Sequence, residues 1–198
     1  EGTAEEGSTV TLFIDGASNA TTTAAANGSY SLTPSISLSD GTYTFSVSAT
    51  DAAGNTSVES AVQNFIIDTT INTPLITTTT TLTNNATPTI EGTAEAGSTV
   101  DLLNGDNVLG TVKADDEGNF SITSSVLADN IYTLTVRATD EAGNISAAAS
   151  VPAIEVDTTA PAQPVITTTG GLTNNNTPVM EGTAEEGSTV TLFIDGAS

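Results

Sequence analysis

The chain offers oxygen ligands and few other groups that could do chemistry. Its 198 residues include 24 Asp and Glu but no His and no Cys. Histidine is the commonest general base and the commonest transition-metal ligand, and cysteine supplies thiolate sites and disulfides, so these chemistries are excluded. Carboxylate, amide and carbonyl oxygens are the ligands of hard cations. The composition therefore favours a hard cation over any other metal.

The candidate ligands recur along the chain. Glu-Gly-Thr-Ala-Glu occurs three times at an offset of 90 residues, and Asp-x-Ala-Gly-Asn and Asp-Thr-Thr each occur twice at an offset of 89. The recurring acids and amides are Glu5, Glu95 and Glu185; Asp51 and Asp140 with Asn55 and Asn144; and Asp68 and Asp157. Such periodicity is the sequence signature of a repeat protein. Carboxylates that recur from repeat to repeat suit architecture better than catalysis, and no Gly-x-Ser-x-Gly motif is present, so we expect no enzyme.

The period defines the domain organisation. We expect residues 1–68 to form a module that lacks its first strand, residues 69–157 a complete module, and residues 158–198 the beginning of a third. Residues 1–18 and 181–198 are identical. We therefore expect both ends to be cuts inside a repeat. The alternative is that neighbouring chains complete each other's partial modules by strand exchange.

Polar and apolar residues alternate through each repeat, which predicts half-buried β-strands. The clearest examples are residues 43–49 and 132–138, each with one apolar and one polar face. About seven such short segments per repeat, with no helical periodicity, predict an all-β fold of tandem immunoglobulin-like β-sandwich modules with Greek-key topology, arranged end to end. Tyr43 and Tyr132 stand where such a sandwich has its tyrosine corner.

The charge excludes several partners. Lys113 and Arg137 are the only basic residues, and the net charge is −22. Nucleic acids and anionic membrane surfaces are bound through Lys and Arg, so neither is expected as a partner. No apolar stretch approaches the ~20 residues of a membrane helix, so no membrane insertion is expected. Divalent cations are one way to relieve the self-repulsion of so acidic a chain.

Three motifs in a fixed order carry a family resemblance. The strings Ile-Glu-Gly-Thr-Ala-Glu-Ala-Gly-Ser-Thr-Val, Ala-Thr-Asp-Glu-Ala-Gly-Asn and Asp-Thr-Thr-Ala-Pro resemble the bacterial Ig-like repeats of giant repeats-in-toxin adhesins. The resemblance covers the whole chain. It implies a protein secreted by the type I route to the bacterial cell surface, where extender modules hold an adhesive tip away from the membrane in cell adhesion and biofilms. It also implies calcium ions (Ca2+) that stiffen the junctions between modules. What the tip binds does not follow from these motifs.

Strand order predicts which acidic motifs share a pole of the sandwich. The incoming linker and the loops after the second and sixth strands lie at one pole, which brings together Asp68, Glu95, Asp140 and Asn144. This set matches the six to eight oxygen ligands that calcium takes. We therefore predict a calcium site at the junction of the first two modules, with the neighbouring modules of the same chain as its partners.

Other candidate ligands belong to less complete sets. Asp157 and Glu185 repeat the set at the second junction, without the loop after the sixth strand. Glu5, Asp51 and Asn55 repeat it in the first module, without an incoming linker, and Asp40 stands at that module's opposite pole. We expect these incomplete sites to be empty or poorly formed. The competing interpretation is that Asp51 and Asp140 only form Asx turns, and that Asp68 and Asp157 only solubilise linkers.

A second function competes with that of an extender. An Ig-like module can also bind a glycan or a host protein. Glycan sites usually use exposed aromatic side chains, and the chain has no Trp. Phe13 and Phe193 fall at an outward phase of their strand and are the residues that favour this alternative. The other aromatic residues fall mostly at inward phases, so the sequence favours the extender.

Overall fold

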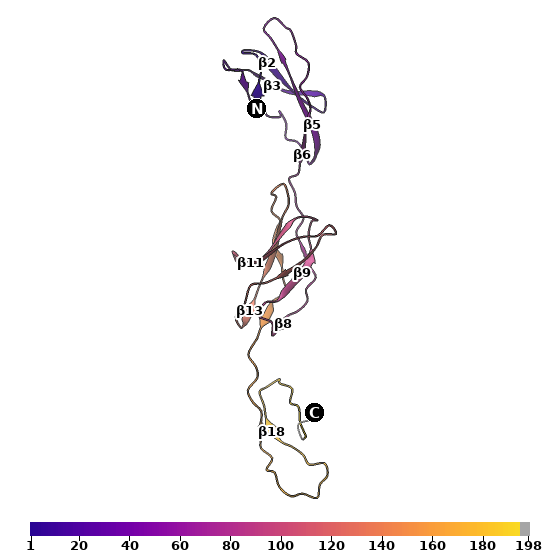
Figure 1. Cartoon of the computed structure of the whole chain (residues 1–198), viewed down its shortest axis with the longest axis vertical. Helices are drawn as coiled ribbons and strands as arrows, with labels where there is room; N and C mark the ends of the chain where they lie inside the picture. Colours follow the sequence, from indigo (N-terminus) through magenta and orange to yellow (C-terminus); the bar gives the residue numbers. More distant parts are fainter. Residues whose placement is uncertain (195–198) are drawn as a thin grey trace.

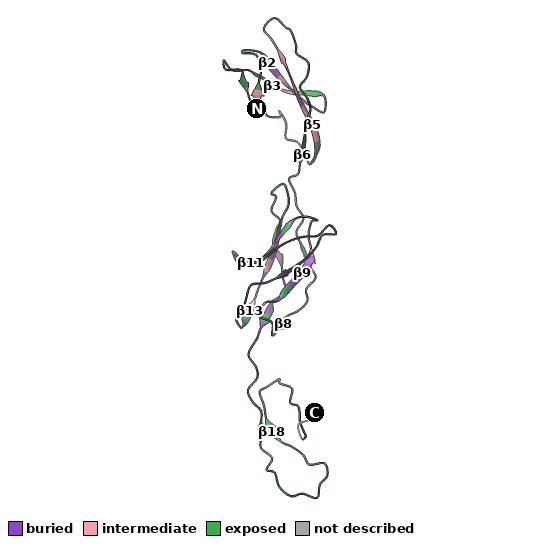
Figure 2. Cartoon of the chain, viewed as in Figure 1, coloured by how far each residue is buried: buried purple, intermediate pink, exposed green. Residues whose placement is uncertain are grey.

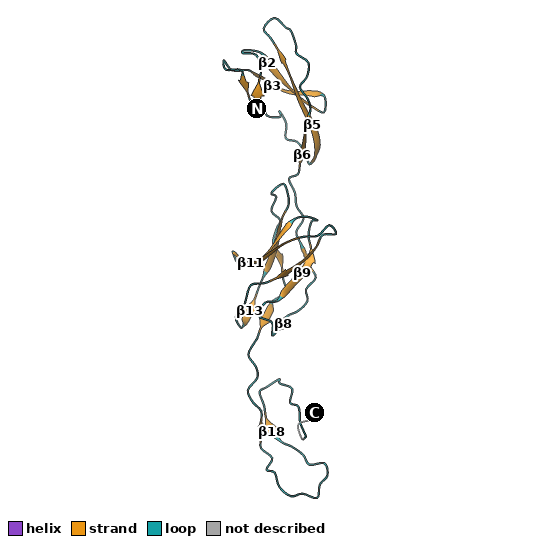
Figure 3. Cartoon of the chain, viewed as in Figure 1, coloured by secondary structure: helices purple, strands orange, loops and turns teal. Residues whose placement is uncertain are grey.

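The computed structural model describes residues 1–194 and shows β-strands and loops throughout, with no helix in that part of the chain (Figures 1 and 3). The first module, the middle module and the third segment follow one another along the long axis of the molecule, joined by extended linkers (Figure 1). We use these names for residues 1–68, 69–157 and 158–194. Among the described residues, no helix is long and apolar enough to cross a membrane.

The middle module is a sandwich of two main sheets. One has three strands in the order β12-β9-β7 and the other four in the order β11-β10-β14-β15, while β13-β16-β8 forms a small sheet at one end. The strands are β7 (Leu75–Ile76), β8 (Leu82–Thr83), β9 (Thr89–Thr93), β10 (Thr99–Asn104), β11 (Asn107–Lys113), β12 (Asn119–Thr123), β13 (Asn130–Tyr132), β14 (Thr135–Thr139), β15 (Ala149–Ser150) and β16 (Ile154–Val156). The chain crosses between the main sheets after β9 and after β11, so the predicted immunoglobulin-like sandwich is confirmed.

Alternation builds the core of the middle module. In β14 the inward residues Val136 and Ala138 are fully buried, and they pair with Leu102 and Val100 of β10. Ile90 of β9 faces them from the other sheet and is also 0% exposed. Figure 2 shows that buried residues concentrate in this module. The period-two pattern therefore identified the core face of these strands.

Both tyrosine corners are confirmed. The Tyr132 hydroxyl donates to the backbone oxygen of Ala128 at 3.0 Å, and the Tyr43 hydroxyl donates to that of Ser39 at 3.0 Å. Each bond spans four residues and holds the turn before the strand. The acidic residue within each turn is thereby fixed relative to the sheet.

The first module contains one main sheet of the sandwich and a short pair. The sheet order is β3-β2-β5-β6, and β1 pairs with β4. The strands are β1 (Gly2–Thr3), β2 (Thr9–Ile14), β3 (Ala17–Thr23), β4 (Ser29–Tyr30), β5 (Gly41–Thr50) and β6 (Gln63–Ile67). Phe65, expected at an inward phase, is 49% exposed, because no described segment takes the place of β7 and β8 over it.

The third segment repeats the first strand pair of the middle module. β17 (Val165–Ile166) pairs with β18 (Gly182–Thr183) in the register of β7 and β9. A Cβ at Gly92 would collide with the backbone oxygen of Leu75, and one at Gly182 with that of Val165. The glycine of the Glu-Gly-Thr-Ala-Glu motif is thus required because the first strand packs directly against it.

Candidate metal centre at the module junction

The loop after β14 presents the most buried carboxylate of the junction. The Asp140 side chain accepts hydrogen bonds from the backbone nitrogen of Asn144 and from Asn144 Nδ2, both at 2.8 Å. Gly143 has a φ of 93°, a left-handed conformation that favours glycine. Asp140 is 9% exposed, so its carboxylate is held rigidly at the edge of the core.

Burial and hydrogen bonding oppose each other at Asp140. Burial by itself raises the pKa of this carboxyl, whereas hydrogen bonds from Asn144, Gly143 and Ala142 lower it, and the net effect is a pKa below the ordinary value of 3.8. Asp140 is therefore negatively charged at neutral pH. An ionised carboxylate is the form that binds a cation.

Glu95 reaches the same place from the loop between β9 and β10. Its backbone oxygen accepts hydrogen bonds from the backbone nitrogen and the hydroxyl of Ser98, at 3.0 and 2.7 Å. Ser98 is 1% exposed and anchors this turn in the module. Within residues 1–194 no hydrogen bond engages the Glu95 carboxylate, which keeps contact with solvent. The turn is fixed while its carboxylate is available to a ligand.

Asp68 arrives on the linker that leaves β6. Its Oδ1 accepts a hydrogen bond from the backbone nitrogen of Thr70 at 3.2 Å. Its backbone oxygen accepts one from Asn144 Nδ2 at 3.0 Å, a contact between the linker and a loop of the middle module. The Asn144 side chain of this loop therefore holds the linker by the backbone oxygen of Asp68.

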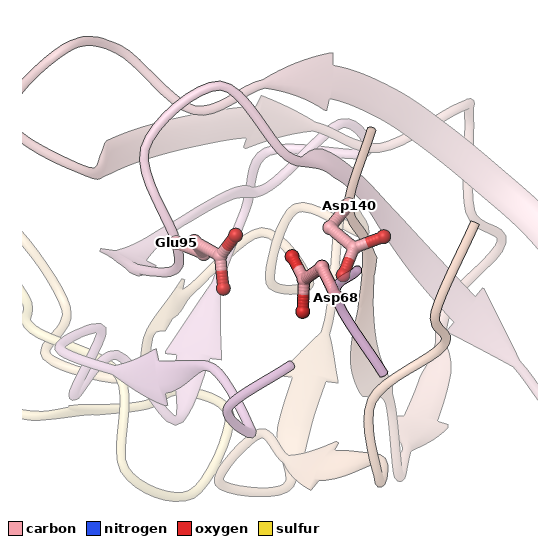
Figure 4. A group of neighbouring side chains, drawn as sticks. All are labelled: Asp68, Glu95 and Asp140. Carbon is pink, nitrogen blue, oxygen red and sulfur yellow. The ribbon is translucent and has the colours of Figure 1, made fainter. Parts of the chain in front are cut away.

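These three carboxylates form one group. Asp68, Glu95 and Asp140 each place a carboxylate oxygen within 4.8 Å of the other two (Figure 4). Three carboxylates from three separate segments supply three to six oxygens, depending on mono- or bidentate binding. Backbone carbonyls and water complete the coordination of calcium elsewhere in proteins. The donor set thus fits a hard divalent cation.

The fourth predicted ligand, Asn144, links two segments of the junction by hydrogen bonds. Its Nδ2 donates both to Asp140 and to the Asp68 backbone. No hydrogen bond from residues 1–194 reaches its Oδ1. The Asx turn that the competing interpretation predicts at Asp140 is present, and it orients the carboxylate within the cluster.

The first-module counterparts do not form such a cluster within the described residues. Asp51 accepts the same two hydrogen bonds from Asn55, both at 2.8 Å, and forms the same turn. The Glu5 backbone oxygen is held by Ser8 at 2.7 Å, as Glu95 is by Ser98. The loops are preformed, and the linker carboxylate is the element that the first module lacks among residues 1–194.

The remaining predicted ligands have other partners. Glu185 Oε2 accepts a hydrogen bond from the backbone nitrogen of Ala162 at 3.0 Å, and Asp157 Oδ1 accepts one from Thr159 at 3.0 Å. The second-junction loop and linker therefore already meet. Asp40 is not part of the three-carboxylate group; both of its oxygens accept hydrogen bonds from Thr69 and Thr70 of the linker. These threonines were missed by sequence reasoning, although Asp-Thr-Thr is repeated.

The features that favour a glycan site are only partly covered in the structure. Phe13 is half-buried, and Leu103, its counterpart in the middle module, is 6% exposed at an irregularity in the pairing of β10 with β11. Phe193 is 61% exposed in the third segment. An open groove of about 680 Å³ in the first module is lined by Leu12, Phe45 and Phe65 among others. Their counterparts in the middle module are core residues, so the groove corresponds to core positions.

The chain was compared with curated proteins, with solved structures and with models of protein families. The chain matches no curated protein. It is similar to fibronectin(III)-like modules of Clostridium thermocellum CbhA, at 18% identity and a TM-score of 0.48, over 79% of this chain and 82% of that one. It is also similar to the BSP domain of a biofilm-associated protein, at 24% identity and a TM-score of 0.36, over 77% of this chain and 25% of that one. The sequence model described as bacterial Ig-like domain matches residues 1–69 and 76–158.

Proposed function

Because the chain belongs to the bacterial Ig-like domain family, we propose that it is an extender segment of a bacterial surface adhesin, stiffened by calcium at its module junctions. The modules follow one another along a single axis, as a spacer requires (Figure 1). The motifs that resemble repeats-in-toxin adhesins support placing it in a protein secreted to the cell surface. Its partners in this function are the neighbouring modules of the same chain.

One observation carries the proposal. Asp68 stands on the linker that leaves the first module, whereas Glu95 and Asp140 stand on loops of the middle module, and the three carboxylates lie within 4.8 Å of one another. Like charges at this separation repel, which favours an open linker in the absence of a cation. A cation bound by all three joins the linker to both loops. The angle between the modules is then restricted at the linker.

Calcium suits this group better than magnesium. The ligands come from three segments with different freedom, and calcium accepts irregular geometry with six to eight oxygens. Magnesium demands near-ideal octahedral geometry and keeps most of its water. With no histidine or cysteine in the chain, softer metals lack the ligands they prefer.

The test compares stability and shape with calcium and with a chelator. Calcium at a hundredfold excess over its dissociation constant stabilises the native state by about 2.7 kcal/mol. We expect a higher melting temperature of the middle module in calcium, and a longer, narrower small-angle scattering distance distribution. Identical melting and scattering curves in calcium and in chelator would refute the proposal.

A matched pair of variants assigns the effect to the junction. Glu95→Gln removes one carboxylate of the group, and Glu5→Gln removes the equivalent carboxylate of the first module. In the 198-residue chain we expect Glu95→Gln to abolish most of the calcium response and Glu5→Gln to leave it unchanged. Equal responses of the two variants would place the calcium effect somewhere other than this junction.

A further inference from the structure

The first residues of the linker are held by the module they leave. Asp40 Oδ1 accepts hydrogen bonds from the backbone nitrogen and the hydroxyl of Thr69, at 3.0 and 2.7 Å. Its Oδ2 accepts one from the Thr70 hydroxyl at 3.1 Å. Both oxygens of this carboxylate are thus used by two consecutive linker residues.

The same arrangement recurs at the end of the middle module. Asp129 Oδ1 accepts from the backbone nitrogen and the hydroxyl of Thr158, at 2.9 and 2.7 Å, and its Oδ2 accepts from the Thr159 hydroxyl at 2.7 Å. Six hydrogen bonds at two junctions therefore follow one pattern. Hydrogen bonds to a charged acceptor are stronger than neutral ones, so each set is a firm attachment.

Strand register explains why these residues meet. Gly41 pairs with Ile67 in the first module, and Asn130 pairs with Val156 in the middle module. Asp40 and Asp129 directly precede β5 and β13, and they therefore lie opposite Asp68 and Asp157, which directly follow β6 and β16. The tyrosine corner spans the aspartate on its own side, since Tyr43 bonds to Ser39 around Asp40. The position of the aspartate is therefore fixed at the point where the linker begins.

Thr70 connects Asp40 to the three-carboxylate group. Its hydroxyl donates to Asp40, and its backbone nitrogen donates to Asp68 Oδ1 at 3.2 Å. Contacts on the side of the first module thereby orient the Asp68 side chain without any bond from the middle module. The bond from Asn144 to the Asp68 backbone then acts from the other side.

We propose that Asp40 and Asp129 are latches that hold the two linker threonines of each Asp-Thr-Thr motif against the preceding module, independently of any cation, and that the Asp40 latch positions Asp68 for the junction cluster. The latch itself follows from the hydrogen bonds at both junctions. Its positioning role rests on the proposed calcium function. The junction then has two separable parts, a permanent attachment on the side of the first module and a cation-dependent one on the side of the middle module.

The latch is tested first in chelator by amide hydrogen exchange. We expect the amide hydrogens of Thr69 and Thr158 to exchange about tenfold or more slowly than in an unstructured peptide. Asp40→Ala should remove the protection at Thr69 and leave Thr158 unchanged, and Asp129→Ala should do the reverse. Unprotected amides in the parent chain, or protection that persists in the matching variant, would overturn the latch.

The positioning role is tested by calcium titration at the first junction. We expect Asp40→Ala to weaken binding by roughly fivefold or more, a modest coupling between two sites. Asp129→Ala removes the equivalent latch at the far end of the middle module and should leave this affinity unchanged. Equal affinities for Asp40→Ala and the parent chain would overturn the positioning role.

Two further variants separate hydrogen bonding from charge. Replacing Thr69 and Thr70 together by Val keeps every charge and removes the donated hydroxyl bonds, so we expect the affinity to fall as in Asp40→Ala. Asp40→Asn keeps an oxygen that can accept both Thr69 bonds and should restore part of the Thr69 protection. An unchanged affinity in the double valine variant would show that the two hydroxyl bonds do not position Asp68, which would overturn this part of the proposal. If calcium binds nowhere in the parent chain, the proposed function fails while the exchange experiment still decides the latch.

Discussion

The side-chain amide of Asn144 donates a 3.0 Å hydrogen bond to the backbone oxygen of Asp68, 76 residues earlier in the chain. Within residues 1–194 the equivalent Asn55 amide of the first module bonds only to Asp51, in its own loop. The same local motif therefore closes a turn in one module and also attaches the linker in the next. This bond is a direct contact between the linker and a loop of the middle module, beside the three-carboxylate group.

Asn144→Ala should weaken the junction more than the fold. The substitution removes the bond to the Asp68 backbone and the bond to Asp140, at a cost of roughly 1 kcal/mol for each bond. We expect weaker calcium binding and a broader distribution of inter-module distances, measured by titration and by pairs of spin labels in the two modules. Asn55→Ala is the control, and an equal loss of calcium affinity in that variant would contradict the assignment.

Gly143→Ala tests whether the turn must present Asp140 in one orientation. Gly143 adopts a φ of 93°, and its counterpart Gly54 adopts 91°. Because alanine is strained in that region, each substitution should destabilise its own module by about 1 kcal/mol. Only Gly143→Ala should also reduce calcium affinity, because only its loop belongs to the three-carboxylate group. Isothermal titration of the two variants checks this, and matching affinities would contradict it.

The sandwich could be predicted from the sequence because its signals are local. Alternation in residues 132–138 identifies an inward face, and Val136 and Ala138 are indeed fully buried. The exposure of Phe65 could not be read in the same way, since it depends on which strands lie across from it. A period-two pattern gives the side of a strand that faces inward and does not show what covers that side.

The acidic residues also differ in how far the sequence predicts their partners. Strand order alone places the linker and two loops at one pole, and the structure brings Asp68, Glu95 and Asp140 together there. The partners of Asp40 follow instead from the register of β5 and β6, which puts it opposite the start of the linker. A shift of one residue would turn its side chain away. Register across a strand pair cannot be read from one sequence, so the bonds of Asp40 with Thr69 and Thr70 were missed.

The latches also make a prediction about pH in the absence of calcium. Side-chain hydrogen bonds from Thr69 and Thr158 lower the pKa values of Asp40 and Asp129, respectively, below the ordinary value of 3.8. A folded-state pKa below the unfolded value means that the unfolded chain binds more protons, so this stability is present above 3.8 and is lost as the pH falls through the lowered pKa.

Melting temperatures in chelator should therefore change little from about pH 7 to pH 5 and fall below about pH 4. Asp129→Asn should reduce the steepness of this fall for the middle module, because one carboxylate no longer titrates. Thermal unfolding followed by circular dichroism across that pH range provides the measurement. A fall that begins near neutral pH, or one that the variant leaves equally steep, would contradict the assignment.

The core of the middle module should respond to truncation independently of the junction. Ile90 is fully buried in β9, where it faces β10 and β14 from the opposite sheet. Ile90→Ala removes three carbon atoms from a closed core and should cost about 2–5 kcal/mol in the free energy of unfolding. Ile131→Ala, at a side chain that is 62% exposed, should change it by no more than about 0.5 kcal/mol. Chemical denaturation in calcium and in chelator measures both, and the calcium-dependent increment should be the same in the two variants. An increment that disappears in Ile90→Ala alone would mean that the junction loops depend on this core residue for their shape.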